Sequence, residues 1–120
     1  MNRSLILFVV SLIVANLVTS SVMANTTMVT SWYGPGLQGN LMANGEEFDM
    51  NDPTVVAHKT LPFGTKLKLT NPDNGHSLIV VVQDRGPFIP GRHLDVSKAA
   101  AKRLGFIKTG VTELVVEVVD

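Results

Sequence analysis

The chain has 120 residues, enough for one domain, and its ten Lys and Arg residues balance its ten Asp and Glu residues. Proteins that bind nucleic acid typically carry an excess of basic residues, so this balance argues against nucleic acid as a partner. The sequence contains no cysteine. We therefore expect neither a disulfide framework nor a lipid-modified cysteine that tethers the protein, which means that it is not a lipoprotein.

The N-terminal segment has the pattern of a secretory signal peptide. Arg3 precedes an apolar run from Leu5 to Val18, which is short for a membrane span, and modest or small residues follow at Val22-Met23-Ala24. This predicts cleavage after Ala24, with residues 1–24 as the signal peptide and residues 25–120 as the mature domain. An uncleaved membrane anchor is the alternative. We expect an exported protein, periplasmic or secreted, without a stable membrane anchor after cleavage.

Short strands alternate with turns in the first half of the mature domain. Residues 26–33 are rich in β-forming side chains and end at Gly34-Pro35-Gly36, and residues 54–58 form a second apolar run. Residues 37–53 between them show little periodicity. Because this stretch also carries charged and aromatic residues, it is typical of a functional loop rather than of a linker.

A hairpin is predicted next. Residues 66–70 alternate polar and apolar side chains, and the turn-forming residues 71–75 lead into a strand over residues 76–84. The β-branched run Val80-Val81-Val82 favours a strand buried on both faces. Gly86-Pro87 ends this strand, because proline cannot donate a hydrogen bond to a sheet. Asp84 and Arg85 are therefore expected at the mouth of a rigid core strand.

One helix and a last strand complete the mature domain. Ser97 is a favourable N-cap, residues 98–104 are helix formers, and Gly105 suits the left-handed position that ends a helix. A further strand is predicted over residues 113–119. Five or six short strands with one helix predict a mainly β protein built as a small closed barrel.

Five motifs occur in a fixed order along the mature domain. They are Ser31-Trp32-Tyr33-Gly34, Ala43-Asn44-Gly45-Glu46, Ala57-His58-Lys59-Thr60-Leu61-Pro62-Phe63-Gly64-Thr65, Asp84-Arg85-Gly86-Pro87-Phe88 and Leu94-Asp95-Val96-Ser97. Together they resemble the RlpA (rare lipoprotein A) family of bacterial cell-wall proteins, over nearly all of the mature domain. The resemblance implies a six-stranded double-psi β-barrel with one short helix, a fold shared with expansins. It also implies an endolytic lytic transglycosylase that acts on peptidoglycan glycan strands, preferably strands that lack stem peptides.

The implied reaction sets the chemistry that the site must provide. A lytic transglycosylase cleaves the glycan when the C6 hydroxyl of the muramic residue attacks its own C1, forming a 1,6-anhydro ring. The leaving oxygen needs an acid and the C6 hydroxyl needs a base, and one carboxyl group can serve both steps in turn. The resemblance assigns this work to Asp84, Glu46 and His58, and Asp84 is our first choice as acid and base. Glu47 is the alternative to Glu46.

Each candidate also has a structural alternative. Asp84 and Arg85 can form an ion pair that braces the barrel, Glu46 can be an ordinary solvated loop residue, and His58 can be a hydrogen-bonded core histidine. Trp32, Tyr33 and Arg85 are candidate substrate-binding residues. Because strand residues alternate sides, we expect one of the two aromatic residues to belong to the core.

No metal or cofactor is expected, because His58, His76 and His93 lack the spacing of metal ligands. Asp95, just before the helix, is expected to hold backbone rather than substrate. A second function remains open, in which the domain is a non-catalytic, expansin-like module that binds polysaccharide or loosens the wall without cleaving it.

Overall fold

The structure is a computed structural model and describes residues 25–119. The predicted signal peptide over residues 1–24, with its cleavage site after Ala24, lies outside these residues. Among the helices of the described part, none has the length and apolar character needed to cross a membrane.

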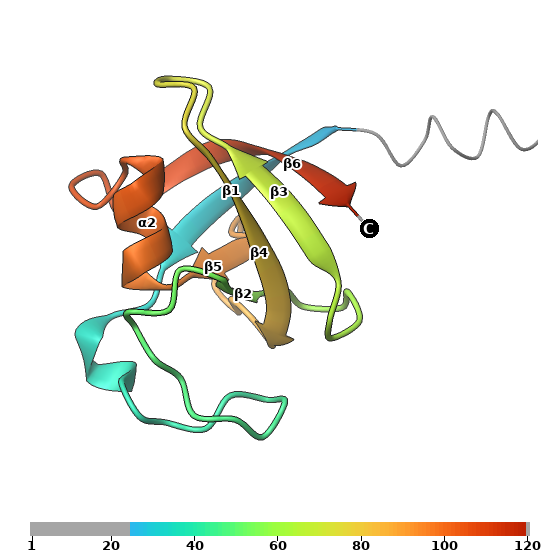
Figure 1. Ribbon diagram of the computed structural model, residues 1–120, viewed down its shortest axis with the longest axis vertical. Coiled ribbons are helices and arrows are strands. Elements are labelled where there is room, and N and C mark those ends of the chain that lie inside the picture. The colour runs from blue at the N-terminus through green and yellow to red at the C-terminus, as the bar shows by residue number, and fades with distance from the viewer. Residues whose placement is uncertain (1–24, 120) are drawn as a thin grey trace, which may run out of the picture.

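The described residues fold into a closed barrel of six strands (Figure 1). The strands are β1 (Thr26–Trp32), β2 (Val55–Ala57), β3 (Lys66–Thr70), β4 (Ser77–Asp84), β5 (Leu94–Val96) and β6 (Val111–Val119). Around the barrel they follow the order β1-β5-β2-β4-β3-β6, with β1–β5 and β2–β4 parallel and the other pairs antiparallel. The mainly β, closed-barrel prediction is confirmed, and the short β5 supplies the sixth strand.

The barrel interior is filled by alternate strand residues. In β3, Leu67 and Leu69 are fully buried whereas Lys66 and Lys68 are exposed, as the alternating sequence predicts. The predicted hairpin is also confirmed, because β3 pairs with β4 in antiparallel register. The main core consists of Val56, Leu67, Leu69, Val80, Val82, Leu94, Val96, Ala100, Ala101, Leu104, Phe106, Leu114 and Val116.

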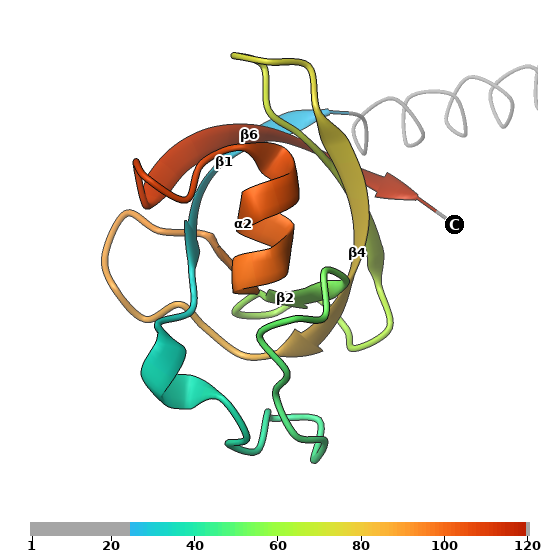
Figure 2. The same cartoon turned by 60° about the vertical axis from the view of Figure 1, so that its left-hand side comes forward.

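Helix α2 (Lys98–Leu104) packs its buried face into this core and lies across the ring of strands (Figure 2). Its caps are those predicted. The Ser97 hydroxyl accepts a hydrogen bond from the Ala100 amide at 3.1 Å, and Gly105 ends the helix in the left-handed region at φ 80°. Ser97 also donates to the carbonyl of Asp52 at 2.5 Å, so the start of the helix anchors the connection between β1 and β2.

The prediction that β4 is buried on both faces is wrong. Val80 and Val82 are fully buried, but Val81 is partly exposed and Ile79 is 51% exposed. A strand of a single barrel has one face toward the interior, and its outer face is buried only where another segment packs over it. The β-branched run therefore reflects strand propensity on the outer face of β4 rather than burial.

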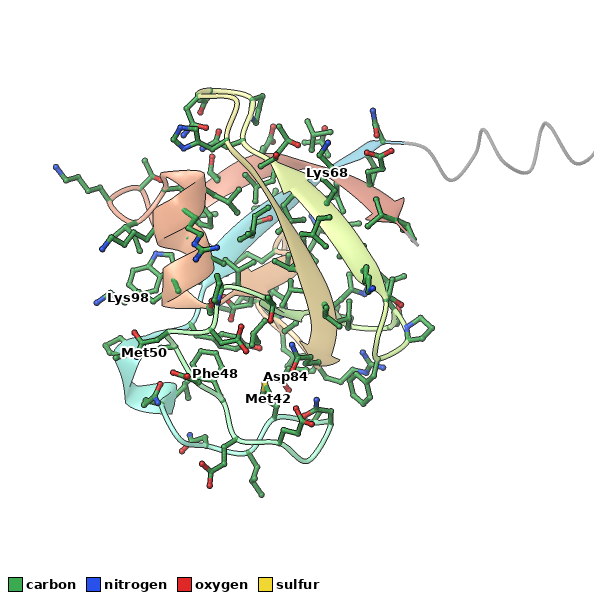
Figure 3. All side chains as sticks on the ribbon, in the orientation of Figure 1. Met42, Phe48, Met50, Lys68, Asp84 and Lys98 are labelled. Atoms are coloured by element: carbon green, nitrogen blue, oxygen red, sulfur yellow. The ribbon has the colours of Figure 1, made fainter. Side chains whose placement is uncertain are left out.

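The long connection between β1 and β2 covers the outer face of β2. It contains the short 3-10 helix η1 (Pro35–Leu37) and a tight turn closed by a bridge between Leu41 and Glu47. Its apolar side chains pack on Val55 and Ala57 to form a second, smaller core, which we call the outer cluster. The outer cluster consists of Tyr33, Met42, Phe48, Val55 and Ala57. Figure 3 shows Met42 and Phe48 in this connection on the same side of the barrel as Asp84.

Candidate active site

Asp84 is the last residue of β4, and its carboxylate is held on both oxygens. Oδ1 accepts hydrogen bonds from the backbone amides of Ala43 and Arg85, each at 2.8 Å. Oδ2 accepts one from the Tyr33 hydroxyl, also at 2.8 Å. The side chain is partly exposed. The structure thus presents a carboxylate of fixed orientation at the end of a core strand, where a ligand can still reach it.

Tyr33 belongs to the outer cluster, and its main polar contact is Asp84. Its ring is buried and packs against Phe48, with the ring centroids 4.5 Å apart and tilted by 56°. Burial raises the pKa of the Tyr33 hydroxyl, and the hydrogen bond to Asp84 raises it further. Tyr33 therefore remains a hydrogen-bond donor to Asp84 at neutral pH. Its buried ring supports Asp84 rather than offering a free face to a sugar.

Trp32 points to the opposite side of the chain from this site. It is partly buried and packs against the main core inside the barrel. The alternation of strand residues thus divides the two aromatic side chains between the barrel interior and the outer cluster. The structure does not bring Trp32 to Asp84.

Arg85 braces the connection between β2 and β3. Its guanidinium donates to the carbonyls of His58 at 3.2 Å and Leu61 at 2.8 Å, and it lies 4.0 Å from the centre of the Phe63 ring. Within residues 25–119 the bond between Arg85 and Asp84 is made by the Arg85 backbone amide, and no ion pair joins the two side chains. The guanidinium therefore orders the segment that follows His58.

His58 follows β2, and its backbone amide donates to the carbonyl of Asp84 at 3.2 Å. Its Nδ1 accepts hydrogen bonds from the amides of Thr60 and Leu61, each at 3.0 Å, which places the proton of the neutral ring on Nε2. Burial lowers the pKa of His58, and the positive charge of Arg85 lowers it further. The imidazole is therefore neutral at pH 7, with Nε2–H as the donor that remains for a ligand.

Glu46 lies in the tight turn of the connection that touches Asp84. The Asn44 side chain accepts from the Glu46 amide at 3.0 Å, and the Glu46 carbonyl accepts from the Met42 amide at 2.8 Å. Ala43, on the same turn, donates its amide to Asp84. The side chains of Glu46 and Glu47 are both exposed. The backbone of this turn thus joins the site, while the Glu46 carboxylate is free to meet a ligand.

Two contributors to the site were not predicted from the sequence. The Ala43 amide has no side-chain signal, and its contact with Asp84 depends on the path of the loop. Asp95 was expected to hold backbone; instead its Oδ1 accepts a hydrogen bond from the Ser31 hydroxyl at 3.2 Å. The signal that could have indicated this contact is the parallel pairing of β1 with β5, because it places Ser31 opposite Asp95.

The site is built from carboxyl groups and hydrogen-bond donors. In the described part of the chain, no group of three or more His, Cys, Asp or Glu side chains is arranged to hold a metal ion. A fixed carboxylate, a neutral imidazole that can donate, and an exposed glutamate are suited to moving protons to and from hydroxyl groups. Such an arrangement fits chemistry on a sugar.

Comparisons with solved structures define the fold class. A Streptomyces papain inhibitor is 24% identical with a TM-score of 0.64, and the match covers 80% of this chain and 94% of that chain. An expansin from Clavibacter michiganensis is 25% identical with a TM-score of 0.61, over 80% of this chain and 50% of that chain. The domain is a double-psi β-barrel of the kind found in these proteins.

Sequence comparisons define the family. A family model described as "Lytic transglycolase" matches residues 25–116. The endolytic peptidoglycan transglycosylase RlpA of Pseudomonas aeruginosa is 50% identical over 75% of this chain and 26% of its own length. The RlpA of Vibrio cholerae is 48% identical over 74% of this chain and 34% of its own length. The chain belongs to the RlpA-like lytic transglycosylase family, and it matches about a quarter to a third of the length of these relatives.

Proposed function

We propose that the protein is an endolytic lytic transglycosylase that cleaves peptidoglycan glycan strands and leaves 1,6-anhydro-muramic ends. The observation that carries the proposal is the Asp84 carboxylate, held at a strand end by donors from Tyr33, Ala43 and Arg85. Membership of the RlpA-like family supports it. Glycan that lacks stem peptides is the proposed preferred substrate.

In this mechanism Asp84 takes the proton of the C6 hydroxyl as that oxygen attacks C1. Its three donors fix the direction in which the carboxylate accepts the proton, and their orientation is set before substrate arrives. The bond from C1 to the leaving oxygen breaks, and that oxygen must receive a proton. That proton comes either from a second acid or from Asp84 itself, where Asp84 enters the reaction protonated, gives its proton to the leaving oxygen and then takes the C6 proton.

His58 and Glu46 are assigned supporting roles. The neutral His58 ring can donate from Nε2 to a sugar hydroxyl or to the carboxylate, since its Nδ1 is already occupied by two backbone amides. Glu46 extends from the turn that contacts Asp84 and can bind the glycan from the solvent side. Arg85 and Phe63 form the neighbouring surface and are candidates for contact with the sugar.

Export is part of the proposal, because peptidoglycan lies outside the cytoplasm. The N-terminal sequence pattern supports a signal peptide over residues 1–24 and a periplasmic or secreted mature protein. N-terminal sequencing of protein recovered outside the cytoplasm should begin at or near Asn25. Recovery of the full-length chain in the membrane fraction would instead support an uncleaved anchor.

The alternative is a non-catalytic module that grips polysaccharide, as the likeness in fold to an expansin suggests. Mass spectrometry of denuded glycan and of whole sacculi after incubation with the mature protein distinguishes the two. The transglycosylase proposal predicts new 1,6-anhydro ends and no new reducing ends. Binding to glycan without new ends of either kind would favour the non-catalytic module.

A further inference from the structure

A second carboxyl group lies in the same row of the barrel as Asp84. β2 runs between β4 and β5, and Ala57 of β2 pairs with Asp84 on one side, after a register shift between Val56 and Ala57, and with Asp95 on the other. Neighbouring strands are about 4.8 Å apart, so roughly 10 Å separates the backbones of the two acidic residues. Residues that pair across neighbouring strands extend their side chains from the same face of the sheet. Here that face is the outer face of the barrel, which the outer cluster covers at Ala57. The two carboxyl groups therefore lie on the outer face of the barrel, on either side of the buried Ala57.

The hydrogen bonding of the two carboxyl groups differs. Asp84 receives three donated hydrogens, an arrangement suited to an ionised carboxylate. Asp95 receives one from a protein group among the described residues, from Ser31 to Oδ1. Asp95 is partly exposed, and no fully buried side-chain oxygen in residues 25–119 lacks a partner, so Oδ2 of Asp95 is not completely buried. Asp95 thus keeps one oxygen to which no described side chain or amide donates.

Burial and the charges around Asp95 favour its protonated form up to about pH 6. Burial raises the pKa of Asp95 to about 6, and the negative charge of Asp84 on β4 adds to this rise. The Ser31 hydroxyl on β1 and the Arg92 guanidinium, in the connection before β5, act in the opposite direction. Tyr33 carries no charge of its own and interacts with both carboxyl groups.

We propose that Asp95 is the general acid of the reaction and that Asp84 is its base, so that two carboxyl groups share the proton transfers. This inference rests on the proposed transglycosylase function. Protonated Asp95 gives its proton to the glycosidic oxygen as the bond from C1 to that oxygen breaks. The C6 oxygen forms the new bond to C1, and its proton passes to Asp84. Afterwards Asp84 releases a proton to solvent and Asp95 takes one up, which restores the starting state.

A pair of substrates tests this division of roles. One is denuded glycan; the other is a short glycan chain that ends in N-acetylmuramic acid linked to 4-nitrophenol, whose anion leaves without protonation. On denuded glycan, Asp95→Asn should reduce kcat by ~10²–10⁴-fold, the usual contribution of general acid–base catalysis. On the nitrophenyl substrate, Asp95→Asn should act within a few-fold of wild type, whereas Asp84→Asn should be slow on both. Asp73→Asn, in the exposed turn after β3, is the control and should match wild type on both.

The pH profile is a second readout. For the wild type, kcat/KM on denuded glycan should fall as the pH rises through about 6, because Asp95 then loses its proton. For Asp95→Asn on the nitrophenyl substrate this fall should be absent.

Other outcomes overturn the inference in distinguishable ways. Wild-type kcat from Asp95→Asn on denuded glycan, or equal losses on both substrates, would remove Asp95 from the acid role and leave the transglycosylase function standing. A wild type that produces no anhydro ends would overturn the function and the inference together. If Asp95→Asn does not fold, carboxyl NMR titration of the wild type decides, since a midpoint for Asp95 near 4 rather than near 6 would contradict the proposal.

Discussion

The Tyr33 hydroxyl donates a hydrogen bond to Oδ2 of Asp84 at 2.8 Å, across 51 positions of sequence. The ring of Tyr33 is fixed by the outer cluster, and Asp84 is fixed by the end of β4. The orientation of the carboxylate therefore depends on the packing of the loop between β1 and β2. Packing on the outer face of the barrel and the proton transfer proposed for Asp84 are linked through this bond.

Tyr33→Phe tests that link. Phenylalanine keeps the ring packing with Phe48 but removes the donor to Oδ2 of Asp84. A hydrogen bond to a charged group contributes about 1.5–3 kcal/mol, so kcat on denuded glycan should fall by roughly 10- to 100-fold. Binding of glycan should change little. An unchanged kcat would show that Ala43 and Arg85 suffice to orient Asp84.

The strands of the hairpin and the caps of α2 could be predicted from the sequence because they depend on local patterns, whereas the double-psi barrel was implied by the family resemblance. Alternation in residues 66–70, the Ser97 N-cap and Gly105 each act within a few residues, and each is found as expected. The contacts of Tyr33 and Ala43 with Asp84 could not be predicted in this way. They depend on the path of a loop whose residues show no periodicity, and in Ala43 the donor is a backbone amide.

Substitutions in β4 distinguish its buried inner face from its partly exposed outer face by their effect on stability. Val82→Asp places an unpaired charge in the main core and should unfold the domain, at a cost of several kcal/mol. Val81→Asp, one residue earlier, places the same charge on a partly exposed position and should cost about 1–2 kcal/mol. Thermal melting monitored by circular dichroism gives both values. Equal destabilisation by the two variants would contradict the single buried face of β4.

The wrong prediction that the outer face of β4 is buried has a physical explanation. Val, Ile and Thr favour strands on exposed and buried faces alike, so a β-branched run indicates a strand but not how many of its faces are covered. Coverage depends on which loop packs outside the barrel. Here the loop packs on Val55 and Ala57 of β2 and leaves Ile79 of β4 exposed.

Arg85→Met is expected to loosen the segment after His58. The variant keeps an apolar stem but loses two hydrogen bonds to the His58 and Leu61 carbonyls and the contact with Phe63. Stability should fall by about 1–3 kcal/mol, measured by urea unfolding. Arg103→Met, which makes the same change at an exposed position of α2, is the matched control. Equal effects of the two variants would mean that the guanidinium of Arg85 has no bracing role.

The raised pKa of Asp95 also predicts a pH-dependent stability. Its pKa is raised from 3.8 to about 6, so folded Asp95 binds more proton than unfolded Asp95 between these values, and its contribution to wild-type stability falls as the pH rises through this window. Asparagine does not titrate and can still accept from Ser31. Asp95→Asn should therefore be more stable than wild type above pH 6, by about 1–2 kcal/mol after allowance for partial exposure.

The measurement is urea unfolding of both proteins at pH 3.5 and at pH 7.5. The difference in unfolding free energy between Asp95→Asn and wild type should be small at pH 3.5 and should reach about 1–2 kcal/mol at pH 7.5. A difference that is the same at both values would show that Asp95 has an ordinary pKa in the folded state.

The most direct test of the account compares wild type with Asp84→Asn on denuded glycan, with the 1,6-anhydro ends counted by mass spectrometry. Asparagine keeps nearly the shape of Asp84 but cannot take the proton of the C6 hydroxyl, so product formation should fall by ~10²–10⁴-fold. Glycan binding should persist, because an amide still hydrogen-bonds a sugar, and Asp73→Asn should match wild type. Anhydro ends formed by Asp84→Asn at the wild-type rate would contradict the assignment of Asp84 as the base.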